Sequence, residues 1–260
     1  MSETVLVTDV GGVRTLTLHR PARRNALTAE MQTTLIAAVK AAGSDSECRV
    51  VVIGGAGEVF CAGLDLKALA EMPGQSAAEH TADAERVAMM FRTLYECPKP
   101  TIAAVRGAAV GGGAGLATIC DFTLAEPTAW FAFTEVKIGF VPAVVSAYLV
   151  LQVGEKRARD LLLTGREVNA EDAFRLGLVN QLAPQGALME RVEELAGALM
   201  RNSPESLRAT KALLAAQSKA WLDAAVAEAL AASAASRKTA DFREGVAAFL
   251  EKRRAVWKKA

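Results

Sequence analysis

The chain is poor in the residues that build metal and disulfide sites. It has two histidines and four cysteines among 260 residues, and the cysteines, at positions 48, 61, 97 and 120, show no metal-type spacing. A zinc site would be hard to assemble from so few ligands, and we expect no metal. The cysteines mostly stand in or beside apolar runs, which is typical of reduced thiols that pack as small hydrophobic residues.

Long apolar runs and an excess of one charge are also missing. No segment approaches 18 uninterrupted apolar residues, and residues 1–4 are not a basic region followed by an apolar stretch. We therefore predict a cytoplasmic protein with no membrane association. The formal net charge of +1 gives no reason to expect nucleic-acid binding. Residues 237–259 hold the one basic concentration, which fits either a solvated helix face or contact with an anionic ligand.

Three common functional signatures are absent as well. The sequence has no Gly-x-Ser-x-Gly turn of a serine hydrolase and no Gly-Lys-Ser/Thr after a glycine loop. A dinucleotide fingerprint starting at Gly111 would need a third glycine where Leu116 stands. These absences weaken the hydrolase, P-loop and dinucleotide-binding hypotheses.

The chain does have enough apolar residues, 52%, for one large core. Residues 5–8 and 13–18 alternate as the strands of a hairpin, and Thr28 is placed to cap a helix through about residue 42. Strand, glycine turn and helix then follow one another up to about residue 180. This order predicts an α/β fold with crossover helices.

Two glycine-bearing turns, at residues 55–66 and 107–113, each follow an apolar run that predicts a buried strand. Each leads into a helical segment, and a helix start leaves its first amides free at the positive end of the dipole. Amides from both turns could converge on one anionic oxygen and form an oxyanion hole, as enolate chemistry requires. The alternative is that the glycines only permit tight turns and close packing.

In order along the chain, these elements resemble the crotonase superfamily, the enoyl-CoA hydratase and isomerase group. The resemblance covers nearly the whole chain and predicts a coenzyme A thioester ligand, with no cofactor beyond the coenzyme A of the substrate. The matching segments are HRPARRNAL (19–27), FCAGLDL (60–66), GAAVGGG (107–113), ICD (119–121), FTEVKIGFVP (133–142), AEDAFRLGLV (170–179) and EGVAAFLEKR (244–253).

The resemblance implies a crotonase-like spiral of ββα units followed by a C-terminal helical trimerisation region. We place the spiral core in residues 1–195 and the helical region in residues 196–260. From about residue 186 the pattern is helical and rich in alanine, with too few large apolar side chains for a core of its own. We therefore expect these helices to pack on something else, as part of a homotrimer or homohexamer.

The resemblance also implies the catalytic residues. The oxyanion donors would be the backbone amides of Leu64 and Gly112, and Glu135 corresponds to one of the two catalytic glutamates of the hydratases. Glu135 lies in an apolar stretch, where desolvation would raise its pKa into a useful range. From the residues alone, Glu135 could equally be a surface glutamate before a turn.

The sequence departs from the family pattern at two places. The second hydratase glutamate should stand where this chain has Gly115, and residues 142–146 read Pro-Ala-Val-Val-Ser instead of a glycine-rich turn. Hydration of a double bond is natural for two carboxylates, whereas one carboxylate can more simply shuttle a proton between the α- and γ-carbons. The departures therefore favour double-bond isomerisation.

Contacts to coenzyme A can be transferred by position only. The corresponding residues are Ala22, Arg24, Ala62, Asp65, Leu66, Phe249 and Lys252, the last two reaching a neighbouring subunit's ligand. Arg24 could instead be a solvated arginine and Phe249 a core residue.

Three further expectations concern polar residues outside the catalytic set. Residues 70–83 could form a mobile cover over the acyl pocket or a plain surface loop, with His80 as a solvated loop histidine. We interpret Asp121 as a buried structural carboxylate held by backbone amides.

We therefore predict an acyl-CoA enzyme of the enoyl-CoA hydratase/isomerase type, in which Glu135 is the single acid/base and isomerisation is preferred. One alternative is a two-group hydratase whose second group is not identified. The other is a catalytically weak acyl-CoA-binding protein, against which the desolvated Glu135 argues.

Overall fold

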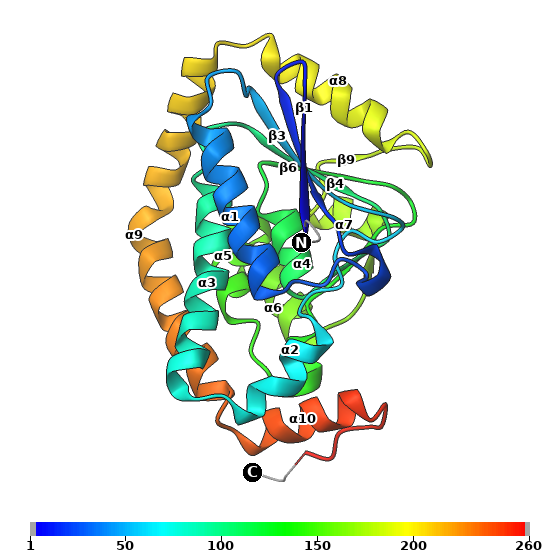
Figure 1. The fold of residues 1–260 in the computed structure, drawn as a ribbon, viewed down its shortest axis with the longest axis vertical. Coiled ribbons are helices and arrows are strands. Elements are labelled where there is room, and N and C mark those ends of the chain that lie inside the picture. The colour runs from blue at the N-terminus through cyan, green and yellow to red at the C-terminus, as the bar shows by residue number, and fades with distance from the viewer. Residues whose placement is uncertain (1–3, 258–260) are drawn as a thin grey trace.

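The computed structural model describes residues 4–257. A six-stranded sheet in the order β1-β2-β3-β4-β6-β9 forms its centre, and β5-β7-β8 form a smaller sheet. Figure 1 shows the large sheet between α8 on one side and the layer of α1, α3, α5 and α9 on the other. The strands are β1 Val5–Val10, β2 Val13–Leu18, β3 Val50–Gly55, β4 Thr101–Val105, β5 Ala108–Val110, β6 Phe122–Ala125, β7 Trp130–Ala132, β8 Val168–Asn169 and β9 Gln181–Leu182.

Most of the predicted elements are confirmed. β1 and β2 form the predicted antiparallel hairpin, and β2, β3, β4, β6 and β9 pair in parallel. The Thr28 side chain caps α1 by accepting from the amide of Met31 at 3.2 Å. The α-helices are α1 Ala29–Ser44, α2 Leu66–Glu71, α3 Ala77–Tyr95, α4 Gly112–Thr118, α5 Ala143–Val153, α6 Glu155–Thr164, α7 Ala170–Leu176, α8 Leu188–Met200, α9 Pro204–Ser236 and α10 Ala240–Leu250, and the 3₁₀ turns are η1 Pro21–Arg23, η2 Met72–Gly74 and η3 Glu135–Ile138.

The central strands are buried on both faces because alternate side chains point to opposite sides. Val51 and Ile53 of β3 join the main core with α1, α3, α4 and α5, whereas Val50 and Val52 pack on α8. The apolar run therefore encodes a strand between two helical layers.

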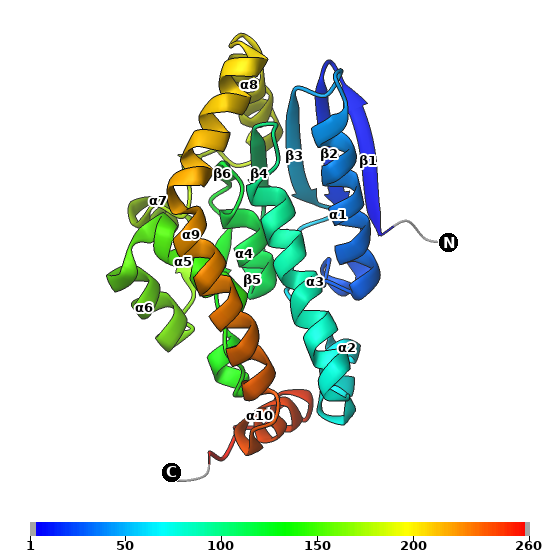
Figure 2. The same cartoon turned by 90° about the vertical axis from the view of Figure 1, so that its left-hand side faces the viewer.

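The C-terminal helices pack on the rest of their own chain. The 33-residue α9 lies along α5 and α3, and α10 packs on η3 and α2 (Figure 2). The predicted boundary at residue 195 falls inside α8, which covers β3, β4 and β6. A division of the chain there stays a prediction.

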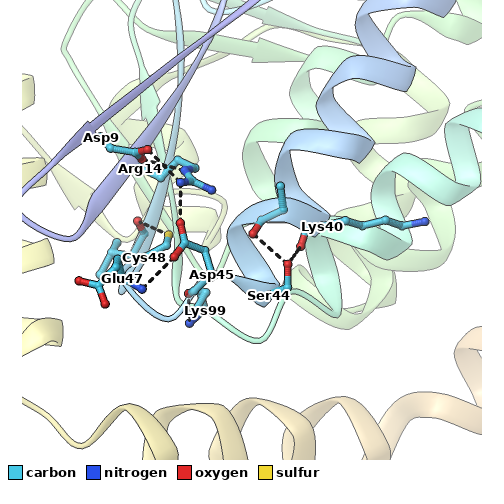
Figure 3. Close-up of polar contacts among 10 residues, drawn as sticks. Asp9, Arg14, Lys40, Ser44, Asp45, Glu47, Cys48 and Lys99 are labelled. Atoms are coloured by element: carbon cyan, nitrogen blue, oxygen red, sulfur yellow. Dashed lines mark hydrogen bonds and ion pairs between the residues drawn. The ribbon is translucent and has the colours of Figure 1, made fainter.

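An ion-pair chain ties the first hairpin to the end of α1 (Figure 3). Arg14 of β2 donates from Nε to Asp9 at 2.7 Å and from Nη2 to Asp45 at 2.7 Å. Lys99 approaches the same turn and donates to the Asp45 carbonyl at 2.9 Å. These contacts hold β1–β2, the α1 C-terminus and the segment before β4 together.

The alternative that segment 70–83 is a plain loop is wrong, and so is the expectation that His80 is solvated, whereas a mobile cover stays a prediction. The segment is mostly helical, containing the end of α2, η2 and the first turns of α3. His80 is 5% exposed, and its Nε2 lies 2.8 Å from the carbonyl oxygen of Met72. The Ser76–Glu79 capping box starts α3 inside the polar stretch.

Asp121 has the expected structural role, but the expectation of a buried carboxylate is wrong. Its side chain is 29% exposed and accepts from the amide and hydroxyl of Thr101 at 2.7 and 2.9 Å. Lys211 of α9 pairs with the same oxygen. The carboxylate joins the start of β4 to α9 from a partly solvated position.

Candidate active site

The first glycine turn is held by the buried side chain of Asn25. Its Nδ2 donates to the carbonyl oxygens of Ala56 and Val59 at 2.9 and 2.7 Å, and its Oδ1 accepts from the amide of Arg20. A Cβ at Gly55 would lie 2.8 Å from that Nδ2, so only glycine fits there. Asn25 therefore holds the first glycine turn in shape. The sequence alone did not single out this role, although Asn25 stands in the 19–27 motif.

The two glycine turns contact each other through their backbones. Cys61 donates to the Ala108 carbonyl at 3.0 Å and accepts from the amide of Val110 at 2.9 Å. Gly63 has φ +85°, and a Cβ there would lie 2.7 Å from the Val110 carbonyl oxygen. The close approach explains the glycine and brings the segment before α2 against the start of α4.

This contact leaves the amides of Leu64 and Gly112 free. Leu27 donates to the Gly63 carbonyl at 2.7 Å and accepts from Asp65 at 3.2 Å, so the Leu64 amide faces away from this bridge. Gly112 is the first residue of α4, whose initial amides have no intrahelical acceptor. Neither amide has a hydrogen-bond acceptor within residues 4–257. Both are available to a ligand oxygen.

The Glu135 carboxylate lies beside the second turn. A Cβ at Gly111 would be 3.2 Å from its Oε1. The residue is partly exposed, but Oε2 is buried and has no hydrogen-bond partner in the described chain. Burial raises the pKa of Glu135 to about 7, against a smaller opposing effect of its own backbone amide. The interpretation as a solvated surface glutamate is therefore wrong, since one oxygen of the carboxyl is buried and desolvated.

The direction that a side chain would take from Gly115 is filled by apolar groups. A Cβ there would lie 2.8 Å from both Cζ of Phe91 and Cγ2 of Val145. Phe91 and Val145 are 1% and 6% exposed. The Val145 methyl belongs to the segment 142–146 that we expected to be bulkier and more apolar. No second carboxylate stands at this position.

The residues predicted to contact coenzyme A are arranged around the first turn and at the far C-terminus. Ala22, Arg24 and Leu66 are exposed, and Ala62 donates to the Arg24 carbonyl at 3.0 Å. Phe249 is 50% exposed, so the alternative of a core residue is wrong. Lys252 follows α10 in the left-handed conformation, with φ +56°. Within residues 4–257, no hydrogen bond or ion pair joins Phe249 or Lys252 to the two turns.

Asp65 is engaged within the chain. Burial disfavours its ionisation, but hydrogen bonds from Arg20 and from the Lys67 amide lower its pKa overall. Arg20 Nη1 lies 2.8 Å from Asp65 Oδ2, and the Lys67 amide bond caps α2. Its carboxylate therefore orients the segment that carries the Leu64 amide.

The four cysteines have no catalytic arrangement. All are free and buried, and burial raises the pKa of each thiol, to about 12 for Cys61. Buried neutral thiols are poor nucleophiles. Cys61 instead packs where the two glycine turns meet.

Comparison with known proteins identifies the family of this chain. The sequence profile described as enoyl-CoA hydratase/isomerase matches residues 8–260. The chain belongs to the enoyl-CoA hydratase/isomerase family. It is an acyl-CoA enzyme of that type with the crotonase fold, as the motifs predicted.

Relatives of the family match at full length. A Thermus thermophilus protein, named provisionally as an enoyl-CoA hydratase, is 45% identical over 245 residues, covering 94% of this chain and 97% of the relative. The 2,3-dehydroadipyl-CoA hydratase of Escherichia coli is 34% identical and covers 97% of each chain. A crystal structure of an enoyl-CoA hydratase from Mycobacterium avium superposes with a TM-score of 0.88 at 33% identity, covering 99% of this chain and 100% of the other. Within residues 4–257, no helix is long and apolar enough to cross a membrane.

Proposed function

We propose that this family member isomerises the double bond of an enoyl-CoA thioester, using Glu135 as its one acid/base group. The observation that carries the proposal is the buried Oε2 of Glu135, which has no partner in the described chain and lies beside the turn that ends at the free Gly112 amide. A carboxyl with a pKa of about 7 can both take and return a proton near neutral pH.

In the proposed reaction, the Glu135 carboxylate removes an α-proton from a 3-enoyl thioester. The electron pair moves into a dienolate whose oxygen accepts hydrogen bonds from the amides of Leu64 and Gly112. The protonated Glu135 then delivers the proton to the γ-carbon, which leaves the 2-enoyl isomer and restores the carboxylate. No cofactor beyond the coenzyme A of the substrate is needed.

Hydration of a 2-enoyl thioester is the second candidate function. It is favoured by the names of relatives, including the Escherichia coli 2,3-dehydroadipyl-CoA hydratase. Against it, the position of the second hydratase glutamate is Gly115, and Phe91 and Val145 fill the space before it. A catalytically weak acyl-CoA-binding protein is a third reading, but binding alone gains nothing from a desolvated carboxyl.

A panel of 2-enoyl and 3-enoyl thioesters, followed by mass and absorbance, separates these functions. We expect conversion of the 3-enoyl to the 2-enoyl thioester to be faster than addition of water to the 2-enoyl form. Isomerisation conserves mass, whereas hydration adds one water, so the two products are distinguished directly. Rapid hydration with the 3-enoyl substrate untouched would refute the isomerase proposal and identify a hydratase.

The same panel can be applied to an enzyme with the second carboxylate restored. Gly115→Glu alone places its Cβ too close to Phe91 and Val145, so we expect misfolding or no gain. Adding Phe91→Ala and Val145→Ala makes room, and this triple variant should gain hydration relative to the Phe91→Ala/Val145→Ala control.

We also propose that the chain assembles as a homotrimer or homohexamer in the cytoplasm. On α9, Leu213, Leu214 and Trp221 are 62%, 58% and 46% exposed, which leaves apolar surface uncovered in one chain. The free cysteine thiols fit a reducing compartment. Light scattering should give three or six times the 27.4 kDa chain mass, and a stable monomer at working concentration would contradict assembly.

A further inference from the structure

A buried ion pair fastens the end of α9 to α3. The Arg237 side chain, directly after α9, is 3% exposed. Its Nη2 lies 2.7 Å from the Asp83 carboxylate, and its Nη1 donates to the His80 carbonyl at 3.0 Å. Both acceptors belong to α3, so Arg237 fixes the point where the chain turns from α9 into α10 (Figure 2).

The same guanidinium contacts the segment that carries Glu135. Its central carbon lies 5.2 Å from the centre of the Phe140 ring, a favourable cation–π distance. The Phe140 amide donates to the Glu135 carbonyl at 3.0 Å and so closes the η3 turn. Arg237 therefore restrains a residue bonded to the backbone of the proposed acid/base group.

The Phe140 ring extends this contact to α10 and to the first glycine turn. Its centre lies 5.5 Å from that of Phe242, which is fully buried in a cluster with Leu69, Met72 and Val246. Leu64, Ile138 and Phe140 pack against this cluster. One apolar unit thus supports both the residue with a free oxyanion amide and the Glu135 turn.

The backbone of α10 packs directly against the backbone of η3 and the residue that follows it. A Cβ at Gly245 would overlap the Ile138 carbonyl, and one at Gly139 would overlap the Asp241 carbonyl. Because α10 and η3 are in direct backbone contact, a shift of α10 has to move η3 as well.

We propose that Arg237 is a positioning residue for the reaction, holding Phe140 and α10 so that the Glu135 carboxylate stays aligned with the amides of Leu64 and Gly112. The proposal rests on the function proposed above for Glu135. Arg237 acts through Phe140 and η3, not through contact with substrate. Removing one partner of a buried ion pair destabilises a fold when the other charge is left unpaired, but Asp83 keeps a second partner, Arg86, at 2.7 Å. We therefore expect the main effect of losing Arg237 in alignment.

The kinetic test compares Arg237→Met with Arg92→Met. Arg92 pairs with Asp223 and joins the same two helices, α3 and α9, but it does not contact Phe140. We expect Arg237→Met to lower kcat on the order of 10- to 100-fold while KM changes less than about threefold. Arg92→Met should stay within about twofold of wild type. Arg237→Lys, which keeps a cation for Asp83 and the ring, should recover part of kcat.

The second readout does not depend on which residue is catalytic. Hydrogen exchange of the Phe140 amide should be at least about tenfold faster in Arg237→Met than in wild type or Arg92→Met. If exchange is faster in Arg237→Met but the Glu135→Gln enzyme is still active, the function proposed for Glu135 is refuted. The coupling of Arg237 to Phe140 is then retained. Should Arg237→Met fail to fold, Phe140→Leu keeps the α3–α9 ion pair, removes the aromatic face and should show the same kcat loss. Unchanged exchange, a loss in KM alone, or an equal kcat loss in Arg92→Met would overturn the proposal.

Discussion

Glu135→Gln should abolish turnover of both 2-enoyl and 3-enoyl thioesters while leaving thioester binding largely intact. The amide keeps the size and shape of the carboxyl but cannot take a proton, and losing an acid/base group lowers rate by about 10² to 10⁴-fold. Because the carboxyl is buried and its Oε2 has no partner among the described residues, no ion pair is broken by the change. Steady-state rates, together with calorimetric binding of a saturated acyl-CoA, measure the two effects separately.

A second buried glutamate supplies the control. Glu126 is 3% exposed, pairs with Arg106 at 3.2 Å and accepts from the Gly186 amide at 3.3 Å, so its carboxylate is engaged within the chain. Glu126→Gln should retain wild-type turnover if the enzyme folds. In wild type, kcat/KM for the 3-enoyl substrate should rise with pH through about 7 and then level, because the base acts when deprotonated. Substantial turnover by Glu135→Gln would remove Glu135 from the mechanism.

Gly112→Pro should lower turnover by at least about 100-fold by deleting one oxyanion donor. Loss of a single donor typically costs about 10² to 10³ in rate, or 3 to 4 kcal/mol. Gly112 is the first residue of α4, a helical position that tolerates proline because the amide there has no intrahelical acceptor. The helix should therefore survive, and circular dichroism checks this beside the rate measurement.

Gly112→Ala is the matched control, because it adds a side chain and keeps the amide. Its Cβ would lie 3.5 Å from Cδ1 of Leu27, an ordinary packing distance. We expect Gly112→Ala to stay within about tenfold of wild type, so that the loss in Gly112→Pro reports the amide itself. Equal activity of folded Gly112→Pro and wild type would exclude Gly112 as a donor.

The local structure around the site was predictable because local signals carry it. Apolar runs predicted β3 and β4, Thr28 predicted the start of α1, and glycines predicted both turns. The desolvation of Glu135 followed from its apolar neighbours in sequence, and the resemblance to the crotonases supplied the family that the comparisons confirm.

His80 shows why the same reasoning failed elsewhere. Its surroundings in sequence are polar, and nothing local reveals that Arg237, 157 residues later, donates to the His80 carbonyl. The prediction for Asp121 was wrong in the opposite direction. Its neighbours in sequence are apolar, but its carboxylate lies at a partly solvated edge that it shares with Lys211. Burial depends on which distant segments meet. Neighbours in sequence therefore predict it only where they are also the residue's main neighbours in space.

The sequence by itself determined the α/β fold, the family, the two glycine turns and the absence of a glutamate at position 115. Each of these is written in residue identity or in short-range periodicity, which one segment carries alone. Only the tertiary structure decided that the Leu64 and Gly112 turns meet, that Phe91 and Val145 fill the space before Gly115, and that Arg237 lies on Phe140. These are contacts between segments far apart in the chain, and they form because burying apolar side chains together fixes which backbones come into contact.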